Sequence, residues 1–172
     1  MRAAYYEKQE LEHILAVLMP ANRLALEVSL ATGLRIGDVL ALRTAQLKPR
    51  FTVKEQKTGK TRSVYLPADL LRRAIAQAGR YYVFEGRTTN KCSRTRQAVF
   101  KDLARACKLL RLRTHISPHT ARKTFAVEAY RASGGNLKRV QLLLNHSSEA
   151  VTMLYAMSDE LCKRTRQRPT RQ

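Results

Sequence analysis

Apolar residues recur every three or four positions through most of the chain, which is the spacing of amphipathic α-helices. One face of the first such run carries Leu11, Ile14, Leu15 and Leu18. After Pro20, Asn22 is a candidate N-cap for the next helix, and Gly33 is suited to a left-handed C-cap. The pattern predicts helices over residues 7–19, 22–32, 36–43, 68–78, 94–111, 118–132, 136–145 and 149–156.

The period changes to two in one region of the chain, where polar and apolar residues alternate. Residues 51–57 and 60–66 follow this pattern and are separated by Thr-Gly at 58–59, so we expect an antiparallel hairpin with a two-residue turn. Pairing Val53 with Val64 places the apolar residues of both strands on one face. Residues 81–84 fit a short strand or a buried loop. The predicted fold class is therefore mainly α with a small antiparallel β-sheet, that is, α+β.

The charge of the chain is far from that of an average globular domain. Its 172 residues include 33 Lys and Arg against 13 Asp and Glu, a formal net charge of +20. Residues 1–49 carry a net +1 and residues 50–172 carry +19, and residues 87–123 contain one acid, Asp102. Because apolar residues interleave with these basic ones at helical spacing, the positive charges should have fixed positions. Nucleic acid is the first partner this pattern indicates, and an anionic membrane the second.

Several function classes lack their signatures in this sequence. No apolar run approaches the ~18 residues of a membrane span, and the N-terminus has no signal-peptide hydrophobic region. The three cysteines have no paired spacing, so we expect reduced thiols in a cytoplasmic protein. The Gly59-Lys60-Thr61 segment fails as a P-loop because position 54 is Lys. No carboxylate cluster indicates a two-metal site, so chemistry on nucleic acid should need no metal or cofactor.

Chemistry-bearing residues gather in a few short segments. His119 and Arg122 lie three residues apart at a predicted helix N-terminus, where the dipole favours an anion. His146 follows an apolar helix, and a tyrosine lies nine residues beyond it. Arg35 follows the predicted Gly33 cap, and Asp38 is three residues further on, where we expect it to orient Arg35. The predicted hairpin tip adds two lysines.

Taken together, these segments resemble the catalytic domain of the tyrosine recombinases, the phage integrase family. The resemblance runs from about Glu7 to Tyr155 and departs at Asn145, where the family usually has Gly; Asn tolerates left-handed backbone. It implies a catalytic domain over residues 1–157 and a basic C-terminal tail over 158–172, with the family's N-terminal core-binding domain absent from this chain. The implied catalytic residues are Arg35, Lys57, His119, Arg122, His146 and Tyr155.

The resemblance also implies a mechanism. Tyr155 would attack a DNA phosphodiester and form a 3′-phosphotyrosyl link, while Arg35 and Arg122 would clamp the non-bridging oxygens. Lys57 would protonate the 5′-oxygen, with Lys60 across the turn as the alternative. The remaining two residues are histidines: His119 would assist proton transfer, and His146 would hydrogen-bond the phosphate.

The expected function is site-specific cutting and rejoining of double-stranded DNA. The expected assembly is a monomer in solution and a homotetramer on DNA, without a membrane, in the cytoplasm at the nucleoid. Leu161 in the tail would dock on a neighbouring protomer. Two alternatives remain open at this point: type IB topoisomerase-like relaxation, which uses the same chemistry, and a DNA-binding module without catalysis.

Overall fold

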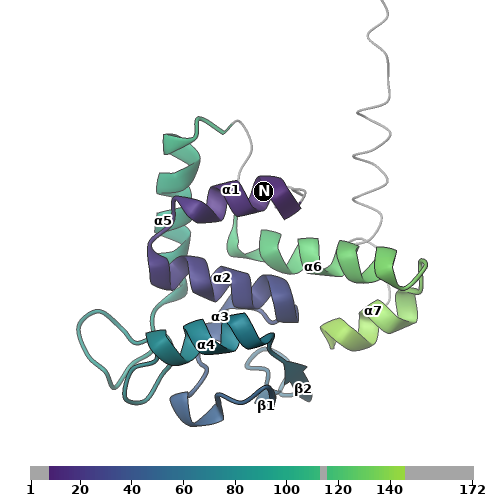
Figure 1. The fold of residues 1–172 in the computed structure, drawn as a ribbon, viewed down its shortest axis with the longest axis horizontal. Helices are drawn as coiled ribbons and strands as arrows, with labels where there is room; N and C mark the ends of the chain where they lie inside the picture. The colour runs from purple at the N-terminus through teal and green to yellow at the C-terminus, as the bar shows by residue number, and fades with distance from the viewer. Residues whose placement is uncertain (1–7, 113–115, 146–172) are drawn as a thin grey trace, which may run out of the picture.

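The computed structural model describes residues 8–112 and 116–145 and is mostly helical (Figure 1). The predicted helix over 149–156, the tail, His146 and Tyr155 lie outside the described residues. None of the described helices is long and apolar enough to cross a membrane. The elements are α1 (Lys8–Ala16), α2 (Pro20–Thr32), α3 (Ile36–Leu40), the 3-10 helix η1 (Thr44–Gln46), β1 (Arg50–Lys54), β2 (Thr61–Tyr65), α4 (Ala68–Gln77), α5 (Arg96–Leu109), α6 (Pro118–Ala132) and α7 (Leu137–Leu144).

Helix α2 is the central element and contacts α1, α3, α4, α5 and α6. It begins at Pro20, two residues before the predicted cap at Asn22. The prediction was wrong because the capping oxygen comes from another helix. The carboxylate of Asp102 on α5 accepts hydrogen bonds from the Met19 backbone N–H at 2.8 Å and from the Asn22 side chain at 2.7 Å. Asn22 is thereby buried in a contact between α2 and α5.

The turn from α2 into α3 depends on Gly33. Its φ is +67°, and its N–H donates to the Ser29 carbonyl at 2.8 Å, as a left-handed C-cap requires. A Cβ at this position would lie 2.5 Å from ring carbons of Phe125 on α6, so a larger residue is excluded by contact as well as by φ. The chain therefore turns at once, and α3 begins directly after Arg35.

The hairpin forms, but its register differs from the predicted one. Val53 pairs with Arg62 and Phe51 pairs with Val64, a shift of two residues that keeps the apolar side chains on one face. The connection is a loop over residues 55–60, closed by hydrogen bonds from the Glu55 N–H to the Lys60 carbonyl and from the Gly59 N–H to the Glu55 carbonyl. The predicted two-residue turn was wrong because the Glu55 side chain is buried in the protein, so that β1 ends at Lys54 and the loop is longer.

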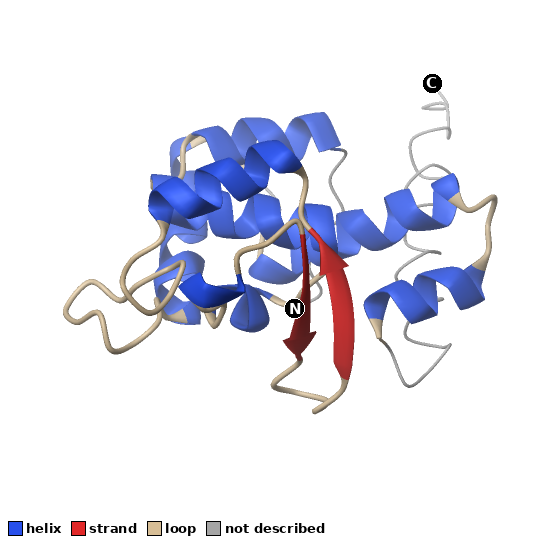
Figure 2. Cartoon of the chain, turned by 60° about the horizontal axis from the view of Figure 1, so that its bottom comes forward, coloured by secondary structure: helices blue, strands red, loops and turns tan. Residues whose placement is uncertain are grey.

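The buried apolar residues form two clusters. The larger cluster joins α1–α5, the inner face of the hairpin and residues 83–84. The segment at 81–84 is therefore a loop buried only in its second half, with one bridge between Arg43 and Tyr82, while Tyr81 is exposed. The smaller cluster contains Ala126, Val140 and Leu144 and lies between α6 and α7. In Figure 2, α7 and the second half of α6 lie to the right of the other helices, and α7 lies beside the hairpin. The fold thus places the hairpin loop, the α2–α3 turn and the start of α6 near one another.

Candidate active site

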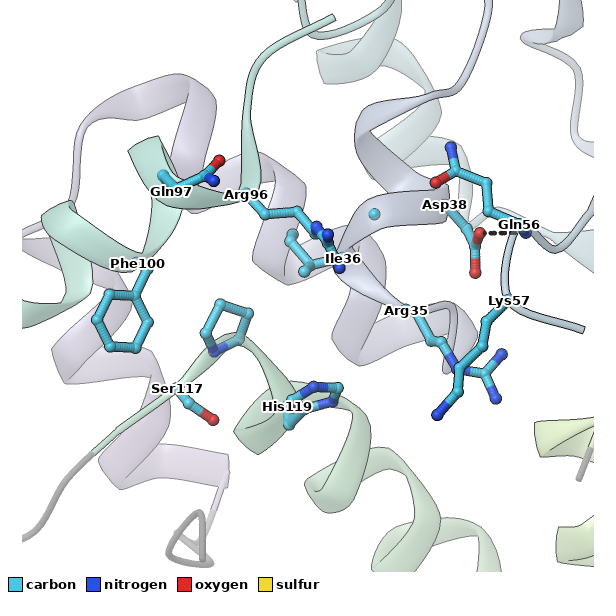
Figure 3. Close-up of a pocket in the computed structure, with 12 residues that line it drawn as sticks. Arg35, Ile36, Asp38, Gln56, Lys57, Arg96, Gln97, Phe100, Ser117 and His119 are labelled. Carbon is cyan, nitrogen blue, oxygen red and sulfur yellow. Dashed lines mark hydrogen bonds between the residues drawn. The ribbon is translucent and has the colours of Figure 1, made fainter. Parts of the chain in front are cut away.

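A cleft of about 700 Å³ opens where α3, the hairpin loop and the first turns of α5 and α6 meet. Arg35, Lys57 and His119 all line it, although they come from three elements far apart in sequence. Figure 3 shows the side chains of Arg35 and Lys57 extending beside each other, with His119 across from them on α6. The structure therefore brings three of the six predicted site residues into one cleft.

Arg35 is held by a buried carboxylate. It occupies the N-cap position of α3, and its guanidinium donates to Glu55, whose side chain has no exposed surface. The same carboxylate accepts a hydrogen bond from Thr58 Oγ1 at 3.1 Å and lies 3.4 Å from Nε of Arg62. Sequence reasoning missed Glu55, although period two places it on the apolar face of its strand with Phe51, which was a usable signal.

Asp38 does not hydrogen-bond Arg35, so its predicted orienting role was wrong. Its Oδ1 accepts the backbone N–H of Gln56 at 2.9 Å, a bond drawn in Figure 3, and it therefore fixes the hairpin loop. Among the described residues, Oδ2 is buried without a hydrogen-bond partner. Burial raises the pKa of Asp38 above its ordinary value of 3.8, against the opposing hydrogen bond from Gln56.

Arg122, one helical turn after His119 on α6, does not line the cleft and is almost completely buried, with 2% of its surface exposed. Its guanidinium donates to two backbone carbonyls, that of Gly33 in the α2–α3 turn and that of Leu144 at the end of α7, the latter at 2.7 Å. Its charge helps to lower the pKa of His119, and it opposes the rise that burial causes in the pKa of Asp38. Arg122 thus joins α6 to the two chain segments that border the site.

His119 lies in the first turn of α6, which begins as its sequence predicts. Pro118 occupies the first helical position, and Ser117 and Thr120 form a reciprocal capping box. The pKa of His119 is lowered from 6.5, first because burial disfavours the charged imidazolium and then because of the nearby positive charges, of which Arg122 has the largest effect. The neutral imidazole, which can accept a proton, is therefore favoured at neutral pH.

The loop geometry separates the two candidate lysines. Lys57 lines the cleft, and its backbone neighbour Gln56 is tied to Asp38. Lys60 is exposed and is not among the residues that line the cleft; its carbonyl closes the loop through the Glu55 N–H. Placement therefore favours Lys57 over Lys60 for contact with a bound group.

The end of α7 has the backbone that the predicted motif needs. Asn145 has φ 52° and ψ 38°, the left-handed conformation expected for the residue that stands where the family usually has Gly. The carbonyl of its neighbour Leu144 accepts a hydrogen bond from Arg122. The end of α7 is thereby held against Arg122.

Two further residues of the cleft were not predicted. Arg96 and Phe100 project from the first turns of α5, which Thr95 caps through the Ala98 N–H. The charge of Arg96 adds to those that lower the pKa of His119. The basic segment with helical spacing was the signal for Arg96. Among the described residues, no three His, Cys, Asp or Glu side chains gather where they could hold a metal ion.

This arrangement of helices, hairpin and basic cleft is that of a tyrosine recombinase catalytic domain. The chain belongs to the phage integrase family, which it matches over residues 5–161. It is 32% identical over 138 residues to the probable integrase/recombinase YoeC of Bacillus subtilis, covering 75% of this chain and 73% of that protein. It is 31% identical to the tyrosine recombinase XerD of Ralstonia nicotianae, over 78% of this chain and 47% of that protein. The chain spans about half the length of most of the curated relatives that it matches, as it does for this XerD.

Solved structures share the fold. The XerA recombinase superposes with a TM-score of 0.73 at 20% identity, over 98% of this chain and 65% of that one. A lambda integrase dimer bound to a COC′ core site gives a TM-score of 0.74 at 19% identity, over 100% of this chain and 63% of that one. The predicted fold class, mainly α with a small antiparallel sheet, is confirmed.

Proposed function

We propose that this chain cuts and rejoins DNA strands at specific sites through a 3′-phosphotyrosyl intermediate on Tyr155, without metal or ATP. The observation that carries the proposal is the convergence of Arg35, Lys57 and His119 on one cleft, with the buried charge of Arg122 near His119. Metal-free cleavage of a phosphodiester needs this combination of charge stabilisation and proton transfer. The names of the relatives and the family support the same activity.

Each residue has a role in a balanced reaction. The Tyr155 oxygen forms a bond to phosphorus as the bond to the 5′-oxygen breaks, and the 5′-oxygen takes a proton from Lys57. The phenol proton passes to neutral His119, consistent with its lowered pKa. The guanidinium groups of Arg35 and Arg122 would clamp the non-bridging oxygens of the phosphate.

His146 would donate to the same phosphate. The phosphotyrosyl ester conserves the energy of the phosphodiester, so attack by a 5′-hydroxyl reverses the reaction without ATP.

Double-stranded DNA is the proposed substrate. The net charge of +20 favours a polyanion, and the cleft side chains Arg35, Lys57 and Arg96 are of the same sign. Among the proteins of similar fold, XerH recombinase and lambda integrase have been solved on DNA. We therefore propose that the protein acts at the nucleoid of the cell.

The test is covalent capture on a nicked suicide substrate. The wild type should form a protein–DNA adduct that resists denaturant, and Tyr155→Phe should form none while binding the same DNA. Tyr130→Phe, on α6, is the matched control and should leave the adduct unchanged. Adduct formation should persist in EDTA. Binding without any adduct from the wild type would favour the DNA-binding module instead.

The same substrate chemistry separates recombination from relaxation. Paired sites should give a four-way junction and exchanged products if the chain is a recombinase. Relaxation of supercoiled DNA with no exchange between paired sites would favour a type IB topoisomerase-like activity.

The assembly on DNA is a separate part of the proposal. Residues 158–172 form a basic segment of which Leu161 is the strongest apolar residue, and we propose that it docks on a neighbouring protomer so that four protomers hold two duplexes. Repulsion at +20 per protomer opposes association until phosphates neutralise it. Light scattering should give a monomer alone and a tetramer with a four-way junction. A chain ending after Ala156 should fail to assemble, and unchanged assembly would refute this role of the tail.

A further inference from the structure

Arg62 is a charged residue on the apolar side of the hairpin. On β2 it pairs with Val53 and shares the inner face with Val64, and only 12% of its side chain is exposed. A guanidinium is seldom placed among apolar side chains unless its N–H groups are bound there. The contacts of Arg62 therefore indicate what it does.

The Arg62 guanidinium joins three segments of the chain. Its Nη2 donates to the carbonyl of Thr32, the last residue of α2, at 2.9 Å. Its Nη1 donates to the carbonyl of Leu143 near the end of α7, and its Nε lies 3.4 Å from the buried carboxylate of Glu55. Both carbonyls belong to the last turns of helices, which have no partner within their own helix and favour a cation.

Arg122 makes the same kind of bridge one residue further along both segments. It binds the carbonyls of Gly33 and Leu144, whereas Arg62 binds those of Thr32 and Leu143. The two arginines come from different elements, β2 and α6, yet they clamp the same pair of chain ends side by side. The end of α7 is thus fixed against the α2–α3 turn by two guanidinium groups.

We propose that Arg62 is a positioning residue, which couples the hairpin loop that carries Lys57 to the end of α7. The inference rests on the proposed function, because its consequence is the relative placement of groups on one phosphate. Through Glu55 it also fixes the carboxylate that holds Arg35. Arg62 lies behind the cleft and is not among its lining residues, so it acts through these contacts and not on the substrate.

The first measurement needs no substrate. Arg62→Met keeps most of the side-chain length and removes every donor, and Arg72→Met, on the exposed face of α4, is the matched control for charge and size. Amide hydrogen exchange in residues 137–145 should become about 10-fold faster in Arg62→Met, with exchange in α2 unchanged. Equal acceleration in α2 and α7 would show that Arg62 only supports the whole fold, and unchanged exchange in α7 would refute the coupling.

The second measurement links the coupling to the reaction. On the suicide substrate, Arg62→Met should cleave about 10- to 100-fold more slowly, with DNA affinity equal to that of Arg72→Met. A 5′-bridging sulfur should not restore its rate, because the defect extends beyond the proton donor Lys57. Arg62→Lys, which retains the charge and reaches one carbonyl, should recover part of both the rate and the protection, and it serves as the test if Arg62→Met does not fold.

The outcomes distinguish the two proposals. A wild type that forms no adduct refutes the proposed function, and the hydrogen-exchange result then still decides whether Arg62 couples the hairpin loop to α7. Full cleavage by Arg62→Met, with the wild type active, refutes the positioning role alone.

Discussion

The guanidinium of Arg35 donates to the carboxylate of Glu55, a residue twenty positions away whose side chain is entirely enclosed by protein. This ion pair joins the N-terminus of α3 to the hairpin loop. A buried carboxylate is tolerated only when its oxygens are paired, and Glu55 has Arg35, Arg62 and Thr58 around it. The orientation of Arg35 in the cleft is therefore a property of the hairpin as much as of its own helix.

Glu55→Gln should destabilise the protein, because it leaves two guanidinium groups without their buried counter-charge. Removal of one partner of a buried ion pair costs about 3–5 kcal/mol, which urea unfolding monitored by circular dichroism would measure as a lower midpoint. Asp69→Asn is the control, since Asp69 pairs with Arg72 on the exposed surface of α4 and its loss should leave the midpoint unchanged. Equal midpoints for wild type and Glu55→Gln would contradict the importance of the buried pair.

Arg35→Ala and Arg122→Ala should each lower adduct formation at least about 100-fold, as expected for a donor to the transferring phosphate. DNA affinity should change little, because many basic residues share the binding. Filter binding and suicide-substrate cleavage, both normalised to the folded fraction in urea, would measure the two effects. A loss of binding in proportion to cleavage would assign these residues to DNA positioning instead.

Lys57→Ala should be rescued by a substrate with sulfur at the 5′-bridging position, since a thiolate leaves with little need of a proton. Arg122→Ala should not be rescued, and Lys60→Ala should cleave the ordinary substrate at nearly the wild-type rate. The ratio of cleavage rates on the sulfur and oxygen substrates is the measurement. Rescue of Lys60→Ala would transfer the proton-donor role across the loop.

Cleavage should remain constant as the pH falls from 8 through 6.5, because the pKa of His119 lies below its ordinary value of 6.5. The rate should decline only at more acidic pH, where His119 becomes protonated. The unfolded chain binds that proton more tightly, so the stabilisation linked to His119 is complete above pH 6.5 and is lost as the pH falls below it. The difference in unfolding free energy between wild type and His119→Gln, measured from pH 8 to pH 5, isolates this effect; a difference that grows as the pH falls would have the wrong sign.

DNA affinity should fall steeply with salt, with a slope of about −0.9 in log K against log salt for each phosphate contact. Arg96→Ala should make the slope shallower by about one such contact, because Arg96 is exposed on the cleft. Arg72→Ala removes the same charge from α4 and should leave the slope as it is. Equal changes of slope in both variants would show that the slope reports the net charge of the protein and not a phosphate contact of Arg96.

The sequence predicted those features that local pattern determines. Helical periodicity located every described α-helix to within a few residues, and Gly33 and Asn145 adopt the left-handed conformations expected of them. The register of the hairpin and the partner of Arg35 were predicted wrongly for a single reason. Glu55 is drawn inward by Arg35 and Arg62, which are distant in sequence, and this lengthens the loop beyond a two-residue turn. Pairings of this kind depend on the assembled fold and leave little trace in local alternation.

Helix α7 packs on a small apolar cluster of its own with α6, and we therefore expect its local stability to be lower than that of the main core. Only Val140 and Leu144 of α7 are buried. The carbonyls of Leu143 and Leu144 also accept hydrogen bonds from Arg62 and Arg122. An element with so little apolar burial is expected to open at a lower free energy than the main core. Local opening of α7 is therefore expected while the main core of the domain stays folded.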